Sequence, residues 1–505
     1  MKKLEGAQLV YSPSDLVQFA SSPFASWMDR YALEHPGQAQ SESPSEEDQL
    51  LFDQGLAHEK AFLDALRRAG RDICEIPDAG AQREALTRNA LEKGREIIYQ
   101  AALSHGEISG IADFLEKTPG KSKLGDYHYT PLDTKLGANP KPRFLLQLSA
   151  YAEMLEGIQG FLPRSVGVIL RGMERRDFRT EDFLYYARAV KGSFLEFMRA
   201  FDASHPPVPE PGADHRGWTS LAESKLRELD HPSAVAGITR SQIKKLAAAG
   251  IDTFTKLATT KAPRIPHLSD STFIRLRDQA ALQKESEGKA KPEFKVVSPD
   301  PEDPRKGLAL LPPPSPEDVY FDMEGYPHVE GGLEYLFGAV HLVAERPEFR
   351  DWWAHDRVAE KRAFEGFIDW AHERWKRAPA MHIYHYASYE VSAARRLMGR
   401  HATREEEVDA LLRAEVFVDL YAVVRTGLRL GTPGYSIKDV EALYREKRQG
   451  VSLPLGSTKH DSRTKGISLR RRGRRRSLLK RTPIRKVHRD QGRRTTSAPT
   501  PLLKG

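Results

Sequence analysis

An acid and a lysine stand two positions apart in YTPLDTKLG, residues 129–137. The apolar and small residues around them predict a strand, in which residues i and i+2 lie on one face, so Asp133 and Lys135 share a side. A second acid, Asp113, lies 20 residues earlier on the strand expected to be its neighbour. Two adjacent carboxylates repel unless a cation compensates, and Mg²⁺ takes carboxylate oxygens. The pattern predicts metal-dependent phosphodiester cleavage; the alternative is an exposed Asp–Lys ion pair.

A second acidic pattern occurs in VYFDMEGYP, where Asp322 and Glu324 are also two positions apart on an expected strand. Burying both acids on one face is costly without a metal or other cations. The segments HIYHYASYE and FVDLY then supply Glu390 and Asp419. Together these acids predict a second metal site, and the alternative is a salt-bridged edge strand.

Alternating helix and strand patterns surround both groups of acids, which predicts an α/β protein. The first pattern has a helix beginning at Asp15 and capped by Ser14, and a further helix within residues 50–70. Strands at 107–117 and 127–137, a helix at 142–160 and a strand at 165–172 follow. The second pattern has strands at 318–325, 335–343 and 381–387, helices at 358–376 and 388–399, and the segment 417–424.

The first group of motifs resembles the RecB-like branch of the PD-(D/E)xK nuclease superfamily over residues 9–200. The matching segments are GLAHE, GIADFL, YTPLDTKL and LLQLSAYAEML, in that order. The resemblance implies a restriction-endonuclease-like fold with the catalytic residues Asp113, Asp133, Lys135, Gln147 and Tyr151. It implies that Asp113 and Asp133 bind the metal together with His58, for which a structural role is the alternative, and Glu59 is a less favoured ligand.

The second group resembles the ribonuclease H-like fold of DEDD-type 3′–5′ exonucleases, in the YprB-like branch. The resemblance implies metal ligands at Asp322, Glu324, Glu390 and Asp419, although Glu390 stands where the family usually carries Asp. The family's last acidic motif is missing, so we expect an incomplete site and an impaired domain.

The order of segments predicts five parts. They are a RecB-like nuclease domain (1–203), a linker with a helix-hairpin-helix-like module (204–284), a Pro-rich linker (285–318), an incomplete ribonuclease H-like domain (319–450) and a basic low-complexity tail (451–505) that we expect to be disordered. Lys244 and Lys245 in the helical module are candidate contacts to nucleic-acid phosphates. The alternative is a helical spacer with solvated lysines.

The net positive charge of the chain comes entirely from the tail. Residues 459–505 carry 17 Lys and Arg against two acids, a net charge of +15, whereas residues 1–458 carry −7. We interpret the abrupt change after residue 450 as a shifted reading frame or a truncated gene. The alternative is a genuine basic arm that binds phosphates.

The composition limits cofactors and location. A single cysteine, Cys74, excludes an internal disulfide, and no iron–sulfur cluster is expected. No run of 18 apolar residues occurs and no signal peptide is recognised, so we expect a cytoplasmic protein without a membrane span.

These resemblances imply a nuclease that uses Mg²⁺ or Mn²⁺ to hydrolyse DNA in repair, recombination or processing. The residues themselves do not separate DNA from RNA. Longer members of the RecB-like putative nuclease family continue into a helicase, and no P-loop occurs here, so a helicase is an expected partner. The alternatives are a non-catalytic nucleic-acid-binding subunit, an inactive front part of a nuclease–helicase, or a ribonuclease acting through the C-terminal domain alone.

Overall fold

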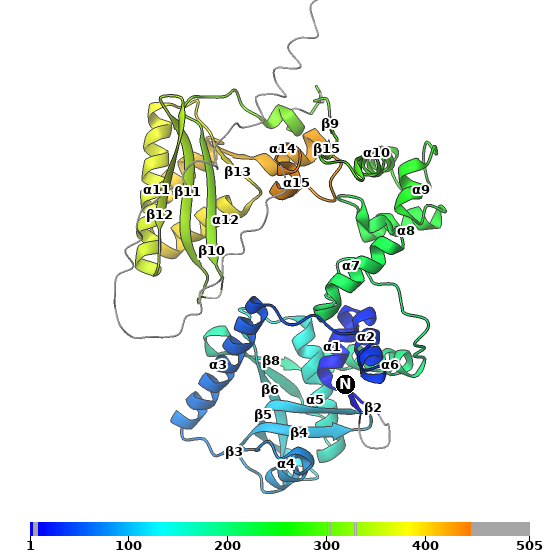
Figure 1. The fold of residues 1–505 in the computed structure, drawn as a ribbon. Coiled ribbons are helices and arrows are strands. Elements are labelled where there is room, and N and C mark those ends of the chain that lie inside the picture. Colours follow the sequence, from blue (N-terminus) through cyan, green and yellow to red (C-terminus); the bar gives the residue numbers. More distant parts are fainter. Residues whose placement is uncertain (4–8, 300, 304, 328, 330, 446–505) are drawn as a thin grey trace, which may run out of the picture. The chain divides into compact units, whose positions relative to one another are not determined.

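The computed structural model describes residues 1–3, 9–299, 301–303, 305–327, 329 and 331–445. It divides into two compact units, Met1–His231 and Pro232–Gly505 (Figure 1). The basic tail and the suspected change of reading frame lie outside the described residues. In the described part of the chain, no helix has the length and apolar character needed to cross a membrane.

The first unit is built on a six-stranded mixed sheet in the order β3-β4-β5-β6-β7-β8. Neighbouring strands are antiparallel except for two parallel pairs, β3–β4 and β6–β7. The strands are β3 (Ile73–Glu75), β4 (Ile97–His105), β5 (Ile108–Ser122), β6 (Gly125–Thr134), β7 (Ser165–Leu170) and β8 (Glu174–Arg179). The predicted pairing of the strands at 107–117 and 127–137 is confirmed, because β5 and β6 are neighbours. The two-residue strands β1 (Lys2–Lys3) and β2 (Leu9–Val10) form a separate pair.

Helices cover both faces of this sheet (Figure 1). One face packs against α1 (Pro13–Ser21), α5 (Pro142–Gln159) and α6 (Glu181–Arg199), around a core that includes Leu115, Tyr129 and Phe194. On the other face, Leu63 of α3 (Glu46–Arg68) packs against Phe114. The remaining helices are α2 (Pro23–Glu34), α4 (Arg83–Glu92) and α7 (Thr219–Glu228).

The start of the first helix corrects one prediction. Helix α1 begins at Pro13, and Ser12 rather than Ser14 is its N-cap. The Ser12 hydroxyl accepts a hydrogen bond from the Asp15 amide, and the Asp15 carboxylate accepts one from the Ser12 amide. This reciprocal capping box, together with a proline that fits the first helical position, fixes the start two residues earlier than predicted.

The second unit starts with a helical module made of α8 (Arg240–Ala248), α9 (Phe254–Thr259) and α10 (Asp270–Ser286). Its core includes Leu246, Leu257, Phe273 and Leu276. The predicted glycine-containing turn between two short helices is confirmed, since Gly250 has φ +79° between α8 and α9. The segment predicted as a Pro-rich linker contains strand β9 (Phe294–Val296), which pairs with β15 (Leu428–Leu430).

A five-stranded sheet in the order β12-β11-β10-β13-β14 forms the larger part of the second unit. Strands β10 (Val319–Tyr326), β11 (Leu333–Val343) and β12 (Arg346–Trp353) are antiparallel, and β13 (Ile383–His385) and β14 (Phe417–Asp419) run parallel to β10. Helices α11 (Arg357–Arg377), α12 (Tyr389–His401) and α13 (Glu405–Arg413) contribute to the core with Phe321, Phe337, Phe364 and Leu397. Helices α14 (Leu420–Gly427) and α15 (Ile437–Glu441) follow β14.

The outer strands of both sheets are short or highly charged. Strands β3 and β14 have three residues each. At the opposite edges, β8 has the sequence ERRDFR and β12 has the sequence RPEFRDWW, and nearly all of their side chains are exposed.

Candidate active sites

Asp113 and Asp133 come together at the end of the β5–β6 pairing. Phe114 pairs with Leu132, and one further step along the antiparallel register brings Asp113 opposite Asp133. The Thr134 amide donates a hydrogen bond to Asp113 Oδ2 at 3.2 Å. Asp113 is half-buried, and Asp133 is 2% exposed. The two carboxylates therefore occupy one enclosed position in the sheet.

The like charges of this pair are incompletely balanced. Burial and the neighbouring negative charge of Asp133 raise the pKa of Asp113 well above its ordinary value. Lys135 Nζ lies 2.6 Å from Asp133 Oδ2, in an electrostatic contact whose angle does not make it a hydrogen bond. An exposed surface ion pair, the alternative for this motif, does not fit a carboxylate that is almost fully buried.

Helix α5 brings the predicted Gln147 and Tyr151 to the same place. The two residues are one turn apart on one helix face, and the Tyr151 hydroxyl donates a hydrogen bond to the Ile111 carbonyl at 2.6 Å. Burial raises the pKa of Tyr151, and the negative charges of Asp133 and Asp113 act in the same direction. Gly110 permits this approach, because a Cβ there would lie 3.1 Å from Tyr151 Cε1.

The GLAHE segment lies on α3, where His58 and Glu59 have different surroundings. His58 Nε2 lies 3.3 Å from the Ile169 carbonyl oxygen, which also accepts the Lys135 amide at 2.9 Å. Glu59 is buried, and its negative charge contributes to the raised pKa of Asp113. The Gln100 side chain donates a hydrogen bond to Glu59 Oε1 at 2.6 Å. The motif predicted Glu59 as a less favoured ligand than His58, but Glu59 is the more buried of the two.

Gln100 has an unusual backbone conformation for its position. Its φ of +58° lies in the left-handed region, which is sparsely populated by non-glycine residues. It falls between the pairs Tyr99–Phe114 and Ala101–Ala112, and so stands opposite Asp113. Backbone strain of this kind is concentrated at functional sites. Here the strained residue, Gln100, is also the one whose side-chain amide donates a hydrogen bond to Glu59.

The donor set around Asp113 and Asp133 fits a hard divalent cation. The buried Asp133 Oδ2 accepts no hydrogen bond from the described residues, and a second carboxylate stands beside it. Within the described ranges, no group of three or more His, Cys, Asp or Glu side chains is arranged to hold a metal. A pair is still sufficient for Mg²⁺, which commonly uses one or two carboxylates together with waters and substrate phosphates.

The second candidate site lies on β10 of the other sheet. Asp322 and Glu324 alternate with the buried Phe321 and Met323, and both acids are exposed. Partial burial raises the pKa of Asp322, and the negative charge of Glu390 raises it further. β10 lies between β11 and β13, and neither acid makes an ion pair with a described basic side chain. A salt-bridged edge strand is therefore not what the structure shows.

Glu390 and Asp419 lie at the starts of two helices. Glu390 is in the first turn of α12, and its Oε2 lies 3.4 Å from Nδ1 of the buried His385, a residue that the sequence analysis did not select. Asp419 Oδ1 accepts hydrogen bonds from the Ala387 amide at 2.9 Å and the Tyr421 amide at 2.8 Å. The structure thus brings Glu390 to Asp322, and it gives Asp419 the role of helix cap for α14.

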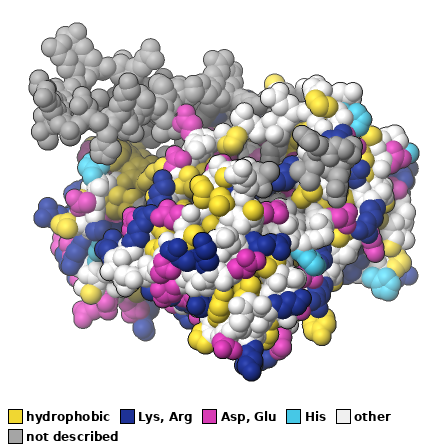
Figure 2. Space-filling view, turned by 90° about the horizontal axis from the view of Figure 1, so that it is seen from below, with side chains coloured by type: hydrophobic (Ala, Val, Ile, Leu, Met, Phe, Trp, Pro, Cys, Tyr) yellow, Lys and Arg dark blue, Asp and Glu magenta, His cyan; other side chains and the backbone are white. Residues whose placement is uncertain are grey.

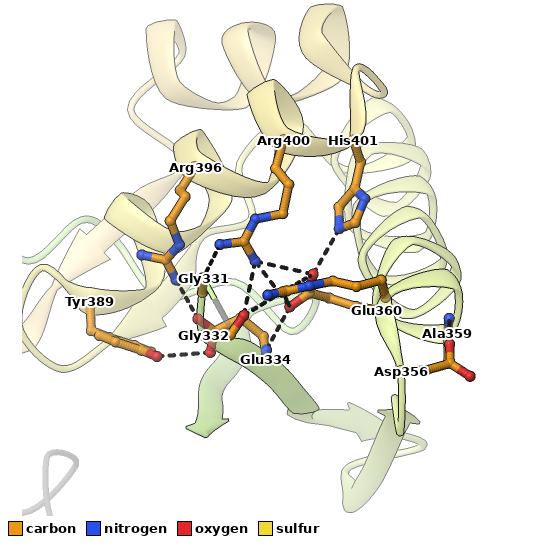
Figure 3. A network of polar contacts seen from close by, with 11 residues as sticks. Gly331, Gly332, Glu334, Asp356, Ala359, Glu360, Tyr389, Arg396, Arg400 and His401 are labelled. Atoms are coloured by element: carbon orange, nitrogen blue, oxygen red, sulfur yellow. Dashed lines mark hydrogen bonds and ion pairs between the residues drawn. The ribbon is translucent and has the colours of Figure 1, made fainter. Parts of the chain in front are cut away.

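A network of buried charges fixes α12 against the β10–β11 hairpin (Figure 3). Glu360 is fully buried and accepts hydrogen bonds from the Glu334 amide at 2.7 Å, from His401 at 2.9 Å and from Arg400 at 3.2 Å. Glu334 in turn accepts hydrogen bonds from Arg396 and Tyr389. Because α12 also carries Glu390, these contacts set the position of Glu390 relative to β10.

Charges of both signs are interspersed over the described surface that Figure 2 shows. Of the two predicted phosphate contacts on α8, Lys244 is exposed and Lys245 is half-buried. Their role in binding nucleic acid stays a prediction.

Comparison with protein families identifies part of the second unit. Residues 319–454 match the model of the RNase_H superfamily. This segment is a ribonuclease H-like domain. The match agrees with the strand order, in which three antiparallel strands are followed by two that run parallel to the first. A ribonuclease H-like domain generally indicates a nuclease-type hydrolase that uses divalent metals. A comparison with curated proteins found no match.

Proposed function

We propose that this protein is a metal-dependent nuclease that hydrolyses phosphodiester bonds, with its main active site at Asp113, Asp133 and Lys135. The observation that carries the proposal is the meeting of two carboxylates and one ammonium group at adjacent strand ends. The ribonuclease H-like domain supports the same class of substrate independently.

Each candidate active-site residue of the first unit has its own role in the proposed mechanism. Asp113 and Asp133 would hold Mg²⁺ or Mn²⁺, which would supply polarisation of the phosphodiester and activation of a water. Lys135, held by Asp133, places a positive charge where it orients the attacking water and stabilises developing negative charge. Tyr151 and Gln147 support the strand end that carries Asp113.

The surroundings of these groups favour such chemistry. Because Asp133 is buried, water screens the charges around it only weakly. The Lys135 ammonium group therefore attracts negative charge at this site more strongly than it would in water. His58 and Glu59 stand on α3 at the same end of the strands, and both are candidates to complete the ligand set. The RecB-like family and the restriction-endonuclease-like fold of the first unit belong to this proposal.

The proposal includes DNA in preference to RNA, a helicase as a partner and a cytoplasmic location, all of which the resemblance or the composition implied. The ribonuclease H-like domain has an accessory role in this proposal, because Asp419 Oδ1 already accepts hydrogen bonds from the Ala387 and Tyr421 amides as the cap of α14. The competing function is a non-catalytic nucleic-acid-binding subunit, which the absence of a three-ligand cluster among the described residues favours.

Cleavage assays test the proposal directly. End-labelled single-stranded DNA and RNA are incubated with Mg²⁺ or Mn²⁺ and with the wild type, Asp133→Asn or Asp322→Asn. Asp126→Asn is the matched control, because Asp126 is an exposed acid on the same strand as Asp133. We expect activity to be lost in Asp133→Asn and retained in the other two variants. Loss in Asp322→Asn alone would move the chemistry to the second unit, and binding without cleavage by the wild type would favour the binding subunit.

A further inference from the structure

Three arginines gather where the helical module meets the small β9–β15 sheet in the second unit. Arg275 is on α10, Arg425 is near the end of α14, and Arg429 is on β15. In the part of the chain that the structure describes, none of these guanidinium groups makes an ion pair with a carboxylate. Two of them have other contacts: Arg429 Nη1 donates a hydrogen bond to the Leu428 carbonyl at 3.4 Å, and the Arg425 guanidinium group lies over the Tyr421 ring, 5.9 Å from its centroid.

Buried amides hold Arg275 next to the strand that carries Arg429. Gln279 lies one turn after Arg275 on α10 and is 1% exposed. Its Nε2 donates a hydrogen bond to the Leu430 carbonyl at 2.6 Å, and its Oε1 accepts one from the Tyr435 hydroxyl at 2.6 Å. These bonds join α10 to β15, and the two arginines are therefore positioned by rigid elements rather than by loops.

The same helix also holds the turn that precedes α8. Gln283 Nε2 donates a hydrogen bond to the Ala234 carbonyl at 2.8 Å, and its Oε1 accepts one from the Ala236 amide at 2.9 Å. Gly237 follows with φ +73°, and a Cβ there would lie 3.8 Å from Arg275 Nη1. Arg275 thus lies between the helical turn and β15.

The positive charges of Arg425 and Arg429 repel that of Arg275. Burial lowers the pKa of Arg275, and the positive charges of Arg429 and Arg425 lower it further. A bound anion would relieve this repulsion. Guanidinium groups match the oxygens of phosphate with two parallel hydrogen bonds, which makes phosphate the best-fitting anion.

We infer that Arg275, Arg425 and Arg429 form a binding site for a backbone phosphate of the nucleic acid that this protein acts on. The inference rests on the proposed function, since the phosphate belongs to the same class of substrate. Contacts of this kind position a nucleic acid without reading its sequence. The site is separate from Lys244 and Lys245, which are on α8.

Salt-dependent binding tests the inference in the full chain. Fluorescence anisotropy with labelled oligo(dT) and oligo(U) compares the wild type with the triple variant Arg275→Gln, Arg425→Gln, Arg429→Gln. A second triple variant, Arg362→Gln, Lys376→Gln, Arg395→Gln, is the matched control, because it removes the same charge from the helices of the same unit. A third variant replaces the three clustered arginines with lysine, which keeps the charge and guards against loss of the fold.

We expect the glutamine variant to bind roughly 10-fold more weakly. The slope of log K against log salt should fall by about one, because the variant no longer neutralises the one phosphate that the cluster binds. The control should keep the wild-type slope, and the lysine variant should keep most of it.

Equal slopes in the cluster variant and the control would overturn the inference. Stabilisation of the wild type by inorganic phosphate, without a change in oligonucleotide binding, would assign the cluster to free phosphate and also overturn it. Cleavage assays on the same proteins separate the two proposals. A wild type that binds through the cluster without cleaving contradicts only the nuclease function, whereas cleavage with unchanged binding in the variant contradicts only the phosphate site.

Discussion

Replacing Asp113 with asparagine should stabilise the first unit while it removes activity. Asparagine keeps an oxygen that can accept the hydrogen bond from the Thr134 amide, so the local geometry is preserved. The substitution removes one of two like charges, whose repulsion contributes to the raised pKa of Asp113. A residue that destabilises the fold but is needed for activity is typical of an active site, where stability and activity are in conflict.

The size of the gain follows from Coulomb's law. Two unit charges about 4 Å apart repel by about 4 kcal/mol at an effective dielectric constant of about 20. The Lys135 ammonium group next to Asp133 offsets part of this repulsion, and the solvent access of Asp113 screens another part. The raised pKa of Asp113 favours its protonated, neutral form, which relieves a further part in the metal-free protein. We therefore expect the free energy of unfolding to rise by about 1–2 kcal/mol in the absence of metal.

Hydrogen exchange of the β5 and β6 peptides measures this free energy in the full chain. The wild type, Asp113→Asn and the control Asp126→Asn are compared in EDTA and with added Mg²⁺. In EDTA, only Asp113→Asn should gain protection. With Mg²⁺, the wild type and the control should gain protection, because a ligand that binds the folded state stabilises it, and Asp113→Asn should gain much less.

Two results would refute this reasoning. Destabilisation by Asp113→Asn in EDTA would mean that the carboxylate is a structural hydrogen-bonding group rather than a source of repulsion. Equal protection of all three proteins by Mg²⁺ would mean that the cation binds elsewhere.

Three further substitutions test the packing and the networks around the candidate sites. Gly110→Ala places a Cβ 2.8 Å from Pro13 Cδ and 3.1 Å from Tyr151 Cε1, and should destabilise the first unit by about 1–3 kcal/mol in urea unfolding, with reduced cleavage. Burial alone would raise the pKa of Glu360, but its hydrogen bonds hold it below the ordinary 4.5. The ionised Glu360 carboxylate therefore stabilises the fold fully at pH values above 4.5, the ordinary pKa of a glutamate. The difference in the free energy of unfolding between the wild type and Glu360→Gln should shrink as the pH falls through the lowered pKa of Glu360. Gln279→Ala leaves the Leu430 carbonyl without its partner and should cost about 1–3 kcal/mol, measured by urea unfolding of the second unit.

Much of the arrangement around Asp113 and Asp133 was predictable from the sequence. The apolar and small residues of 129–137 predicted a strand, in which residues two positions apart share a face, so Asp133 and Lys135 were expected on one side; the 20-residue spacing to Asp113 suited two paired strands. The charged strands β8 and β12 were not predicted, because few of their residues are buried and they lack apolar alternation.

The unpredicted site residues depend on contacts between distant segments. Glu59 and Gln100 are 41 residues apart, and their hydrogen bond follows from the packing of α3 against the sheet. His385 reaches Glu390 because a strand ends just before a helix begins. The role of Asp419 as a helix cap depends on where α14 starts, and helix boundaries are the least predictable feature of a sequence.

The charged edge strands have a consequence for how these molecules meet one another. An exposed sheet edge offers unpaired backbone groups, and another chain can extend the sheet along it. On β8 and β12, any such pairing would have to strip water from Arg, Glu and Asp side chains, and Pro347 of β12 has no amide hydrogen to donate. At the opposite edges, three-residue strands offer too little backbone for a stable ladder. Both sheets are therefore protected against edge-to-edge aggregation, even at the high local concentrations that arise when many copies crowd onto one polymer.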